Sequence, residues 1–282
     1  KRTVFMRVLV FAKHPTGGIR TYMKYVYGNE VMADVQFLLL TPDAEKLDGL
    51  FQGDQNVQLV RSNKTAGNIK LFFLLLKIMI TERPDVLHSH GFTAGSIAAL
   101  PAWLLRVRHI LTTHDVFLGG VFRGLKGRVK WFVLNTTFHV ASVVNPVGKD
   151  AGQNMLQNFP SLRSASRFKV IRNGIPAKNF LGDNSRNLRQ ELQLAKDTLI
   201  AGFFGRFMAQ KGFRTLVDAV AIWNESCSRP LHVCCFGWGG YVREEKEAIK
   251  ERGLEEFFHF LPATDEVAKA IRGVDFVAMP SK

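Results

Sequence analysis

Two cations stand close together in the second half of the chain, after an apolar segment. Residues 199–212 are L-I-A-G-F-F-G-R-F-M-A-Q-K-G, in which Arg206 and Lys211 follow a predicted strand and Gly212 begins a helical pattern. A strand that ends in a glycine turn and leads into a helix presents free backbone N–H groups and a positive helix end to an anion. The planar fork of Arg and the movable charge of Lys suit a diphosphate. The sequence therefore predicts an anion site here; the alternative is a surface turn with two solvated cations.

Polar residues also follow a strand predicted in the first half of the chain. Thr112, Thr113, His114 and Asp115 stand where that strand ends and a loop begins. Doubly wound α/β folds bind their ligands at the carboxyl ends of parallel strands, so His114 is a candidate site residue. The alternative is a histidine whose hydrogen bonds are satisfied by the backbone of its own loop.

Two further histidines, His88 and His90, stand on either side of Ser89 after another predicted strand. Alternate positions on a strand point to the same side, so both imidazole rings are expected on one face. A zinc site would need a further ligand, and no spacing in the sequence identifies one. We therefore expect a structural or cleft-lining role and no metal site.

Gly17 and Gly18 follow Thr16 and precede a predicted helix. Glycine lets the backbone turn tightly and lets it approach a phosphate or a sugar closely. The pair is therefore either a simple turn or part of a ligand-binding loop.

Short β-rich segments alternate with longer helical patterns along the chain. Strands are predicted at 4–11, 35–40, 57–60, 86–88, 109–113, 140–145, 168–171, 198–204, 231–236, 257–260 and 276–279. Helices are predicted at 19–32, 68–81, 93–106, 126–138, 149–158, 213–224, 244–252 and 265–272. This alternation predicts the α/β class, with mostly parallel sheets and helices on both faces. Residues 173–187, with four Asn and few apolar side chains, are the predicted linker between two domains.

The positive charge of the chain is concentrated in its first part. The formal net charge is +14; residues 1–185 hold 24 Lys and Arg against 11 Asp and Glu, and residues 186–282 hold 14 against 13. The first part is therefore expected to meet an anionic partner. The stretch 122–132 interleaves four cations with aromatic residues, which suits either an interfacial segment on anionic lipid or a solvated basic face. Without a recognisable nucleic-acid-binding motif, nucleic acid is not an expected partner.

The three cysteines, Cys227, Cys234 and Cys235, fit neither a disulfide framework nor a zinc-ligand spacing. They are predicted to be reduced thiols in the core. The longest apolar run, at 71–80, contains Lys77 and is too short to span a bilayer. We expect a cytoplasmic protein that can associate peripherally with the inner face of the membrane.

Taken in this order along the chain, the motifs resemble those of the retaining group-1 glycosyltransferases of the GT-B fold (glycosyltransferase family 4-like). The resemblance runs from about Val4 to Ser281, and its most specific motif is G-R-x-x-x-x-K-G at 205–212. Weaker matches are the T-G-G of residues 16–18, V-I-R-N-G-I at 170–175 and F-G-W-G at 236–239. The resemblance implies two Rossmann-like domains: an acceptor-side domain at 1–178 and a nucleotide-sugar domain at 179–282.

The resemblance also implies roles for individual residues. Arg206 and Lys211 would hold the diphosphate of a nucleotide-sugar donor and His114 would lie near the donor sugar, which makes these three the candidate catalytic residues. The candidate donor-binding residues also include the glycines of the predicted turns: Gly17, Gly18, Gly205, Gly237 and Gly239. No metal and no cofactor are expected, because protein cations do the work of a metal and the nucleotide sugar is a substrate.

The chain departs from the family pattern at several positions. Arg172 and Gly240 stand where proline is common, and Pro176 stands where aspartate is common. In the family, two glutamates separated by seven residues follow a Pro-Ser pair, and here their positions would fall beyond Lys282. We therefore expect an incomplete second domain, weak binding of nucleotide diphosphate and inefficient transfer by these 282 residues.

The resemblance predicts a glycosyltransferase of the hexosyltransferase type that acts with retention of configuration. The acceptor would be a glycan or a lipid-linked or polysaccharide precursor. Two alternatives remain open from the sequence. One is a sugar-nucleotide epimerase, which has the same architecture and needs no acceptor. The other is a non-catalytic subunit that binds a sugar nucleotide or a membrane.

Overall fold

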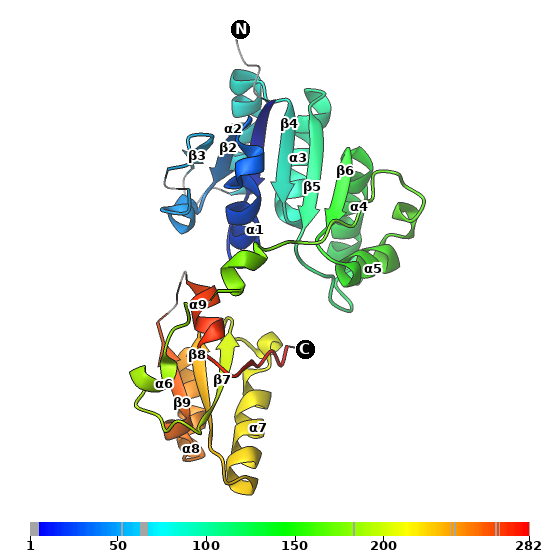
Figure 1. The fold of residues 1–282 in the computed structure, drawn as a ribbon. Helices are drawn as coiled ribbons and strands as arrows, with labels where there is room; N and C mark the ends of the chain where they lie inside the picture. Colours follow the sequence, from blue (N-terminus) through cyan, green and yellow to red (C-terminus); the bar gives the residue numbers. More distant parts are fainter. Residues whose placement is uncertain are drawn as a thin grey trace. The chain divides into compact units, whose positions relative to one another are not determined.

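Two bodies of alternating strands and helices make up the chain (Figure 1). The computed structural model describes residues 6–51, 53–62, 67–182, 184–237, 239, 241–262, 264 and 266–281. Contacts within the chain divide it into two compact units, Lys1–Ile175 and Pro176–Lys282. The division falls inside the segment 173–187, where the sequence places a linker. The acceptor and donor roles of the two domains remain predictions.

A parallel sheet forms the centre of the first unit. Its strands are β1 (Met6–Ala12), β2 (Val35–Thr41), β3 (Val57–Arg61), β4 (Val86–His90), β5 (Arg108–Thr113) and β6 (Val143–Pro146). They lie in the order β3-β2-β1-β4-β5-β6, and every pair is parallel. After β1, strands β2 and β3 extend the sheet on one side of β1, and β4 then pairs with β1 on its other side. The strand order therefore reverses between β1 and β4, the place where such sheets bind ligands.

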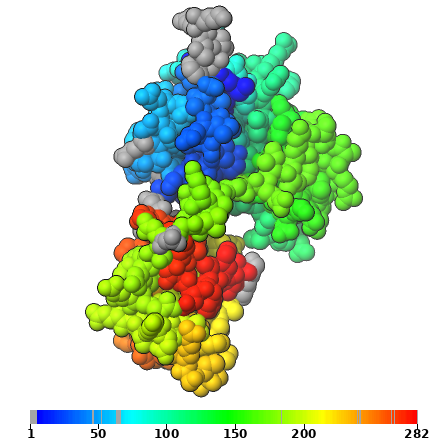
Figure 2. Space-filling view, in the orientation of Figure 1, coloured from blue at the N-terminus to red at the C-terminus, as the bar shows by residue number. Residues whose placement is uncertain are grey.

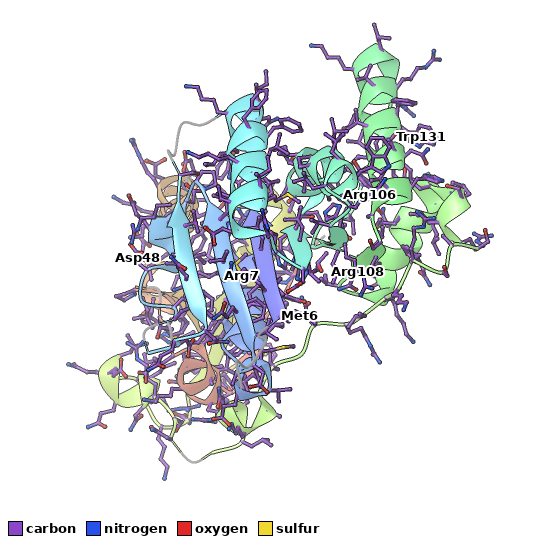
Figure 3. All side chains as sticks on the ribbon, turned by 90° about the horizontal axis from the view of Figure 1, so that it is seen from above. Met6, Arg7, Asp48, Arg106, Arg108 and Trp131 are labelled. Atoms are coloured by element: carbon purple, nitrogen blue, oxygen red, sulfur yellow. The ribbon has the colours of Figure 1, made fainter. Side chains whose placement is uncertain are left out.

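Helices cover both faces of this sheet. They are α1 (Gly18–Tyr27), α2 (Asn68–Glu82), α3 (Phe92–Leu104), α4 (Gly124–Val140) and α5 (Lys149–Asn158), with short 3-10 turns at Glu30–Met32, Ala44–Leu47 and Pro160–Leu162. Figure 3 views this unit from above and shows α2 and α3 on the same side of the sheet. Leu9, Phe11 and Leu87 pack under these two helices. Val8, Val10 and Leu39 point the other way and pack against Met23 and Tyr27 of α1.

The second unit repeats the pattern on a smaller scale. Its strands are β7 (Leu199–Phe204), β8 (Leu231–Phe236), β9 (Phe258–Leu261) and β10 (Phe276–Val277), in the parallel order β10-β7-β8-β9. Its helices are α6 (Leu188–Glu191), α7 (Phe213–Ser226), α8 (Val242–Glu251) and α9 (Val267–Arg272), with 3-10 turns at Ala177–Phe180, Ala209–Lys211 and Glu255–Phe257. Figure 2 shows the red C-terminal segment at the surface of this unit. The α/β class with two Rossmann-like, mostly parallel sheets is confirmed.

Three local predictions are wrong. Residues 168–171 form no strand: Phe168 makes a lone parallel bridge with Val144. The chain then leaves the sheet, because Ile171 N–H donates to the side chain of Asn145 instead of to a backbone carbonyl. The helix predicted at 19–32 ends at Tyr27, before Gly28. Cys227 is exposed at the end of α7, whereas Cys234 and Cys235 are buried thiols as expected.

Candidate functional site

The loops that follow β7 and β8 pack against each other in the second unit. Gly205 N–H donates a hydrogen bond to the carbonyl of Phe236 (3.2 Å). A Cβ atom at Gly237 would lie 2.0 Å from the carbonyl oxygen of Gly205, and one at Gly239 would lie 2.9 Å from that of Phe207. Only glycine allows this approach of two backbones. Gly205, Gly237 and Gly239 are thus brought together, whereas Trp238 of the predicted motif and Gly240 after it lie outside the described residues.

The loop after β7 carries both predicted cations. Arg206 is exposed and Lys211 is half-buried, while the intervening Phe207 is buried in the core and anchors the loop. Gly212 adopts a positive φ of 65° and caps the start of α7. The first N–H groups of a helix have no partner within it and carry a partial positive charge. The loop therefore combines a guanidinium, an ammonium and a helix N-terminus, which is a suitable arrangement for an anion.

The segment after β10 closes on the same helix end. Ala278 N–H donates to the carbonyl of Gly202 (2.9 Å). A Cβ atom at Gly212 would lie 1.9 Å from the carbonyl oxygen of Pro280. Gly212 is therefore required both by its left-handed backbone and by the close approach of Pro280.

In the first unit, the polar residues gather where the sheet reverses its strand order. His90 ends β4 and His114 follows β5, and these two strands are neighbours. Gly17 is the N-terminal cap of α1, with φ 55° and ψ −124°, and a Cβ atom on Gly17 or Gly18 would meet no atom within 4 Å. Positive φ requires glycine at Gly17, while the open space at both positions leaves the backbone accessible.

Four hydrogen bonds join the histidines of this region into one cluster. His114 Nε2 lies 3.0 Å from His90 Nδ1. The hydroxyl of Tyr27 lies 2.6 Å from His90 Nε2 and 2.7 Å from His88 Nδ1. His88 Nε2 lies 2.8 Å from Thr112 Oγ1. As predicted, His88 and His90 share one face of the sheet, and their rings lie 4.4 Å apart between centroids.

Burial keeps this cluster uncharged at neutral pH. Desolvation lowers the pKa of His88 to about 3 and that of His114 to about 4, and it lowers the pKa of His90 well below its usual value. The neighbouring histidines lower the pKa of His88 and of His90 further. Burial also raises the pKa of Tyr27 well above its ordinary value. His114 can therefore donate or accept a hydrogen bond near pH 7, but it does not act there as an imidazolium.

The sequence analysis missed Tyr22 and Tyr27 of α1. The ring of Tyr22 contacts those of His88, His90 and His114 at centroid distances of 6.1, 5.0 and 5.6 Å. Both tyrosines, with Met23, lie on the side of the helix that faces the sheet. Helical spacing could have placed them on an inner face, but it could not have shown that this face covers the histidines.

His109 is also buried and hydrogen-bonded, which its sequence context did not indicate. It occupies the other face of the sheet, where its Nε2 lies 2.7 Å from Ser89 Oγ. Burial lowers its pKa to about 4. It forms a separate buried pair and has no bond to the cluster around His114 among the described residues.

Within the described ranges, no three His, Cys, Asp or Glu side chains are arranged to hold a metal ion. In the same ranges, no helix combines the length and the apolar character needed to cross a bilayer.

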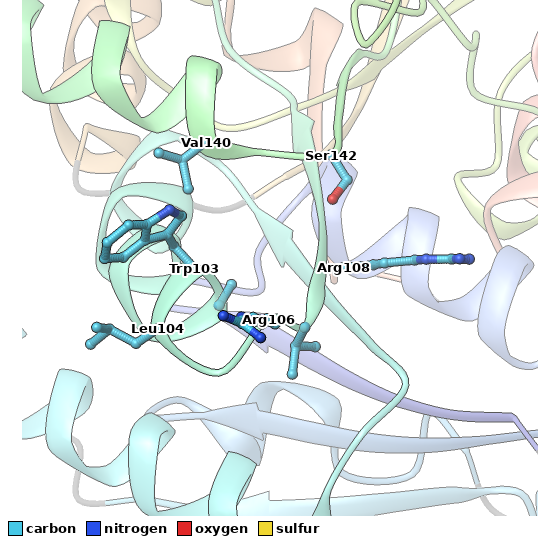
Figure 4. Close-up of a pocket in the computed structure, with 8 residues that line it drawn as sticks. Trp103, Leu104, Arg106, Arg108, Val140 and Ser142 are labelled. Carbon is cyan, nitrogen blue, oxygen red and sulfur yellow. The ribbon is translucent and has the colours of Figure 1, made fainter.

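A hollow of about 550 Å³ lies at the opposite edge of the first sheet (Figure 4). It is lined by the end of α3, the end of α4 and the start of β5, including Trp103, Arg106, Arg108 and Ser142. The predicted site residues are at the carboxyl ends of the strands, so this hollow is not part of the candidate site.

The buried histidines predict a specific loss of stability in acid. Because the folded-state pKa of His88 lies below the ordinary 6.5, the unfolded chain binds its proton first as pH falls. Stability should be full above about pH 6.5 and lower by about 2 kcal/mol at pH 5 from one such histidine. Hydrogen exchange of the β4 amides at pH 7 and at pH 5 measures this loss of stability in the first unit. His88→Gln should reduce the pH dependence of this stability, whereas His139→Gln, at an exposed position, should not. An equal pH dependence in wild type and in both variants would contradict the prediction.

The packed glycine loops predict a steric penalty. In Gly237→Ala, the new methyl group would collide with the carbonyl oxygen of Gly205, 2.0 Å away, and the loops must separate. We expect a loss of about 1–3 kcal/mol in the stability of the second unit, the usual cost of overpacking. Gly182→Ala is the matched control, since its Cβ would meet its nearest neighbour at 3.9 Å. Urea unfolding of both variants tests the difference, and equal midpoints would argue against close loop packing.

Comparison with known proteins agrees with this architecture. The model of Glycosyltransferase Family 4 matches residues 16–179, and that of Glycosyl transferases group 1 matches residues 184–282. A curated relative, the O-antigen biosynthesis glycosyltransferase WclY of Escherichia coli, is 22% identical over 209 residues, which are 71% of this chain and 56% of WclY. The chain thus matches little more than half the length of that relative.

Solved structures share the fold at low identity. HepE of Anabaena, crystallised with UDP-glucose, has a TM-score of 0.80 and 21% identity over 98% of this chain and 74% of its own. A putative UDP-N-acetylglucosamine 2-epimerase from Listeria monocytogenes has a TM-score of 0.66 and 14% identity over 97% of this chain and 74% of its own. These likenesses show the fold alone. The family models cover both units, and the chain therefore belongs to Glycosyltransferase Family 4, within the group 1 glycosyltransferases of the GT-B fold.

Proposed function

We propose that the protein transfers a sugar, of the hexosyl type, from a nucleotide-diphosphate donor to a glycan or lipid-linked acceptor with retention of configuration. The observation that carries the proposal is the pair of glycine loops after β7 and β8, which hold Arg206 and Lys211 beside the N-terminus of α7. Family membership supports transfer chemistry. The names of the relatives support the substrate class, since WclY is an O-antigen glycosyltransferase and HepE was crystallised with UDP-glucose.

The chemistry places negative charge on the departing nucleotide diphosphate. Cations and backbone N–H groups fixed at that position stabilise the transition state more than the ground state. Arg206 and Lys211 take this role in the proposal, and the N–H groups at the start of α7 add to it. Because these protein groups neutralise the leaving group, the proposal requires neither a metal nor a cofactor.

His114 has a different task in this proposal. Its pKa of about 4 leaves it neutral at physiological pH, so it positions the donor sugar by a hydrogen bond and transfers no proton from an imidazolium. Gly17 and Gly18, at the start of α1, leave the backbone there open. We assign the acceptor to the first unit and the nucleotide sugar to the second.

The alternative functions are separated by one assay. An epimerase of this fold would convert a nucleotide sugar without any acceptor, whereas a transferase needs an acceptor for transfer. A non-catalytic subunit would bind the nucleotide sugar and do neither. Incubation of the protein with a panel of nucleotide sugars, with and without glycan acceptors, distinguishes these three outcomes. Membership in a glycosyltransferase family favours the transferase.

The diphosphate role of the two cations predicts weaker nucleotide binding without them. Arg206→Ala and Lys211→Ala should each weaken binding of UDP by about 1.5–3 kcal/mol, the range for hydrogen bonds to charged groups. Both residues lie on a loop outside the core, so each variant should fold. Calorimetric titration with UDP, and with GDP in case the base differs, measures the change. Lys196→Ala, another exposed cation of the second unit, should bind normally, and unchanged affinity in both loop variants would remove the proposed donor site.

We also propose that the first unit docks on an anionic membrane surface through α4. Leu125, Val129 and Phe132 form a stripe at helical spacing, and all three are exposed although the opposite side of α4 packs in the core. Arg128 and Lys130 of the same helix are also exposed. Figure 3 shows α4, with Trp131 labelled, projecting from the unit. Apolar side chains flanked by cations suit the interface of acidic lipid.

This docking surface predicts selective, salt-sensitive binding. The protein should co-sediment with phosphatidylglycerol vesicles more than with phosphatidylcholine vesicles, and less at high salt, because screening weakens charge attraction. Phe132→Ser and the Arg128→Glu, Lys130→Glu pair should each reduce binding. Val31→Ser and Lys24→Glu are matched controls, since these exposed residues lie outside α4. Equal sedimentation with both lipids would contradict docking on an anionic membrane. It would instead favour a soluble anionic acceptor as the partner of the basic surface.

A further inference from the structure

The backbone of the loop that carries His114 is bonded to α5 and not to the sheet. The ladder of β5 ends at Thr113, whose carbonyl accepts from Val147 N–H (3.2 Å). Residues 114–118 have no regular secondary structure, and in the described part of the chain no backbone–backbone hydrogen bond involves residues 114–117. Backbone polar groups that leave a sheet need other partners. The partners of this segment lie on α5.

Asn154 of α5 bonds both backbone groups of Phe117. Its Oδ1 accepts from the Phe117 N–H (2.7 Å), and its Nδ2 donates to the Phe117 carbonyl (2.9 Å). These two bonds fix the orientation of the amide, because only its oxygen can accept and only its NH₂ group can donate. One side chain thus replaces the two hydrogen bonds that a residue of a neighbouring strand would give.

The side chain of Phe117 is a second anchor of the loop. It is buried and stacks on the ring of Phe92 at the start of α3, with centroids 4.3 Å apart. It also contacts the rings of Phe122 and Phe159, at 5.1 and 5.5 Å. Aromatic pairs at such distances stabilise beyond the area that they bury. The backbone and the side chain of Phe117 are therefore both held, three residues after His114.

The residue before His114 is held by the same helix. The hydroxyl of Thr113 donates to Sδ of Met155 (3.3 Å), and both side chains are fully buried. Met155 directly follows Asn154 in α5. His114 therefore belongs to a short segment whose two ends, Thr113 and Phe117, are bonded to consecutive residues of one helix.

His114 has a defined place within this segment. Its Nε2 lies 3.0 Å from His90 Nδ1, and its ring contacts that of Tyr22 at 5.6 Å between centroids. Its Nδ1 is buried and has no hydrogen-bond partner among the described residues. A shift of the loop away from α5 would displace the imidazole from His90 without breaking a bond of β5, because His114 lies beyond the ladder. The position of the imidazole thus depends on the anchor at Phe117.

Helix α5 itself gains little from an asparagine at position 154. Asparagine is among the weaker helix formers, because its side chain competes for backbone hydrogen bonds. Both side-chain groups of Asn154 bond the loop, and none bonds the helix among the described residues. Asn158 is the contrast, since its Nδ2 donates to the carbonyl of Asn154 within α5 (2.8 Å). The two asparagines therefore differ in what they hold.

We propose that Asn154 is a positioning residue, which fixes the loop after β5 on α5 and thereby holds the His114 imidazole in its place beside His90. Asn154 does not touch the ligand and acts through Phe117. The use of a fixed imidazole rests on the proposed function, in which His114 orients the donor sugar by a hydrogen bond. The positioning itself does not depend on that function.

The test measures the loop and the imidazole separately, by NMR of the whole chain at pH 7. Asn154→Leu is close to asparagine in shape and removes both bonds to Phe117. The Phe117 amide should then exchange its hydrogen roughly tenfold faster or more, because it loses its acceptor. The imidazole ¹⁵N signals of His114 should move, because the ring leaves its place beside His90. Asn158→Ala, the matched control, should leave both measurements as in wild type.

Two internal references distinguish these local changes from unfolding. The amide of Leu111 in β5 should stay protected, and the signals of His109, which bonds Ser89 on the other face of the sheet, should not move. In a variant that is folded by these references, unmoved His114 signals would show that Asn154 has only a structural role and would overturn the proposal. An unchanged exchange rate of the Phe117 amide would overturn it as well.

Asn154→Asp is the conservative variant. Its carboxylate can still accept from the Phe117 N–H but cannot donate to the Phe117 carbonyl. The Phe117 amide should therefore keep more protection than in Asn154→Leu, while the His114 signals should still move. If Asn154→Leu does not fold, these two measurements on Asn154→Asp decide the proposal, and His114 signals at their wild-type positions would overturn it.

Titration with UDP-glucose and a panel of other nucleotide sugars separates this proposal from the proposed function. If a nucleotide sugar perturbs His114 in wild type but Asn154→Leu leaves His114 in place, the proposed function stands and the positioning role is overturned. If Asn154→Leu moves His114 and no nucleotide sugar perturbs it, the positioning role stands and the sugar-orienting role of His114 is overturned.

If both proposals hold, Asn154→Leu should change kcat and KM differently. It should lower kcat for transfer roughly tenfold or more, because misplacement acts on the reacting geometry. The KM for the nucleotide sugar should change little, because Arg206 and Lys211 hold the diphosphate in the proposed function. A rise in KM with an unchanged kcat would contradict positioning for the reaction.

Discussion

Buried imidazoles must satisfy their hydrogen bonds without carrying charge, and this constraint shapes the carboxyl edge of the sheet in the first unit. Removing a charged imidazole from water is costly, so His88, His90 and His114 stay neutral and satisfy one another through the hydroxyls of Tyr27 and Thr112. A fully satisfied buried network rigidifies its members, while a single unpaired group is expensive. Among the described residues, the Nδ1 atom of His114 is the member of this network that has no hydrogen-bond partner, and His114 directly follows β5.

In the second unit, the loops after β7 and β8 combine backbone and cations in an arrangement suited to an anion. Glycine at 205, 237 and 239 removes the side chains that would separate the loops after β7 and β8. The left-handed turn at Gly212 then starts α7 directly after Lys211. The result is a loop held by a buried Phe207 while its cations remain outside the core. The same eight residues thus combine closely packed backbone with two charged side chains.

The sequence predicted most of this framework where the signal is local. Alternation of strands and helices gave the α/β class, and period-two spacing put His88 and His90 on one face. The strand predicted at 168–171 is wrong. The segment is rich in β-forming residues, but only Phe168 pairs with the sheet. The links through Tyr27, Thr112 and Asn145 depend on strand register and on how α1 packs, which are tertiary facts. For the same reason, the glycines were recognisable as turns, but the contact between Gly205 and Gly237 was not.

In the proposed function, the two units supply residues of different electrostatic character. A departing diphosphate carries charge throughout and gains more in the transition state, so permanent cations such as Arg206 and Lys211 are appropriate there. A sugar hydroxyl is neutral, and a charged partner would be an expensive group to bury beside it. Burial makes His114 a neutral hydrogen-bonding group with a pKa of about 4, and its Nε2 is held at 3.0 Å from His90 Nδ1. The proposed function therefore assigns the charged residues to the leaving group and gives a neutral hydrogen-bonding residue the task of orienting the sugar.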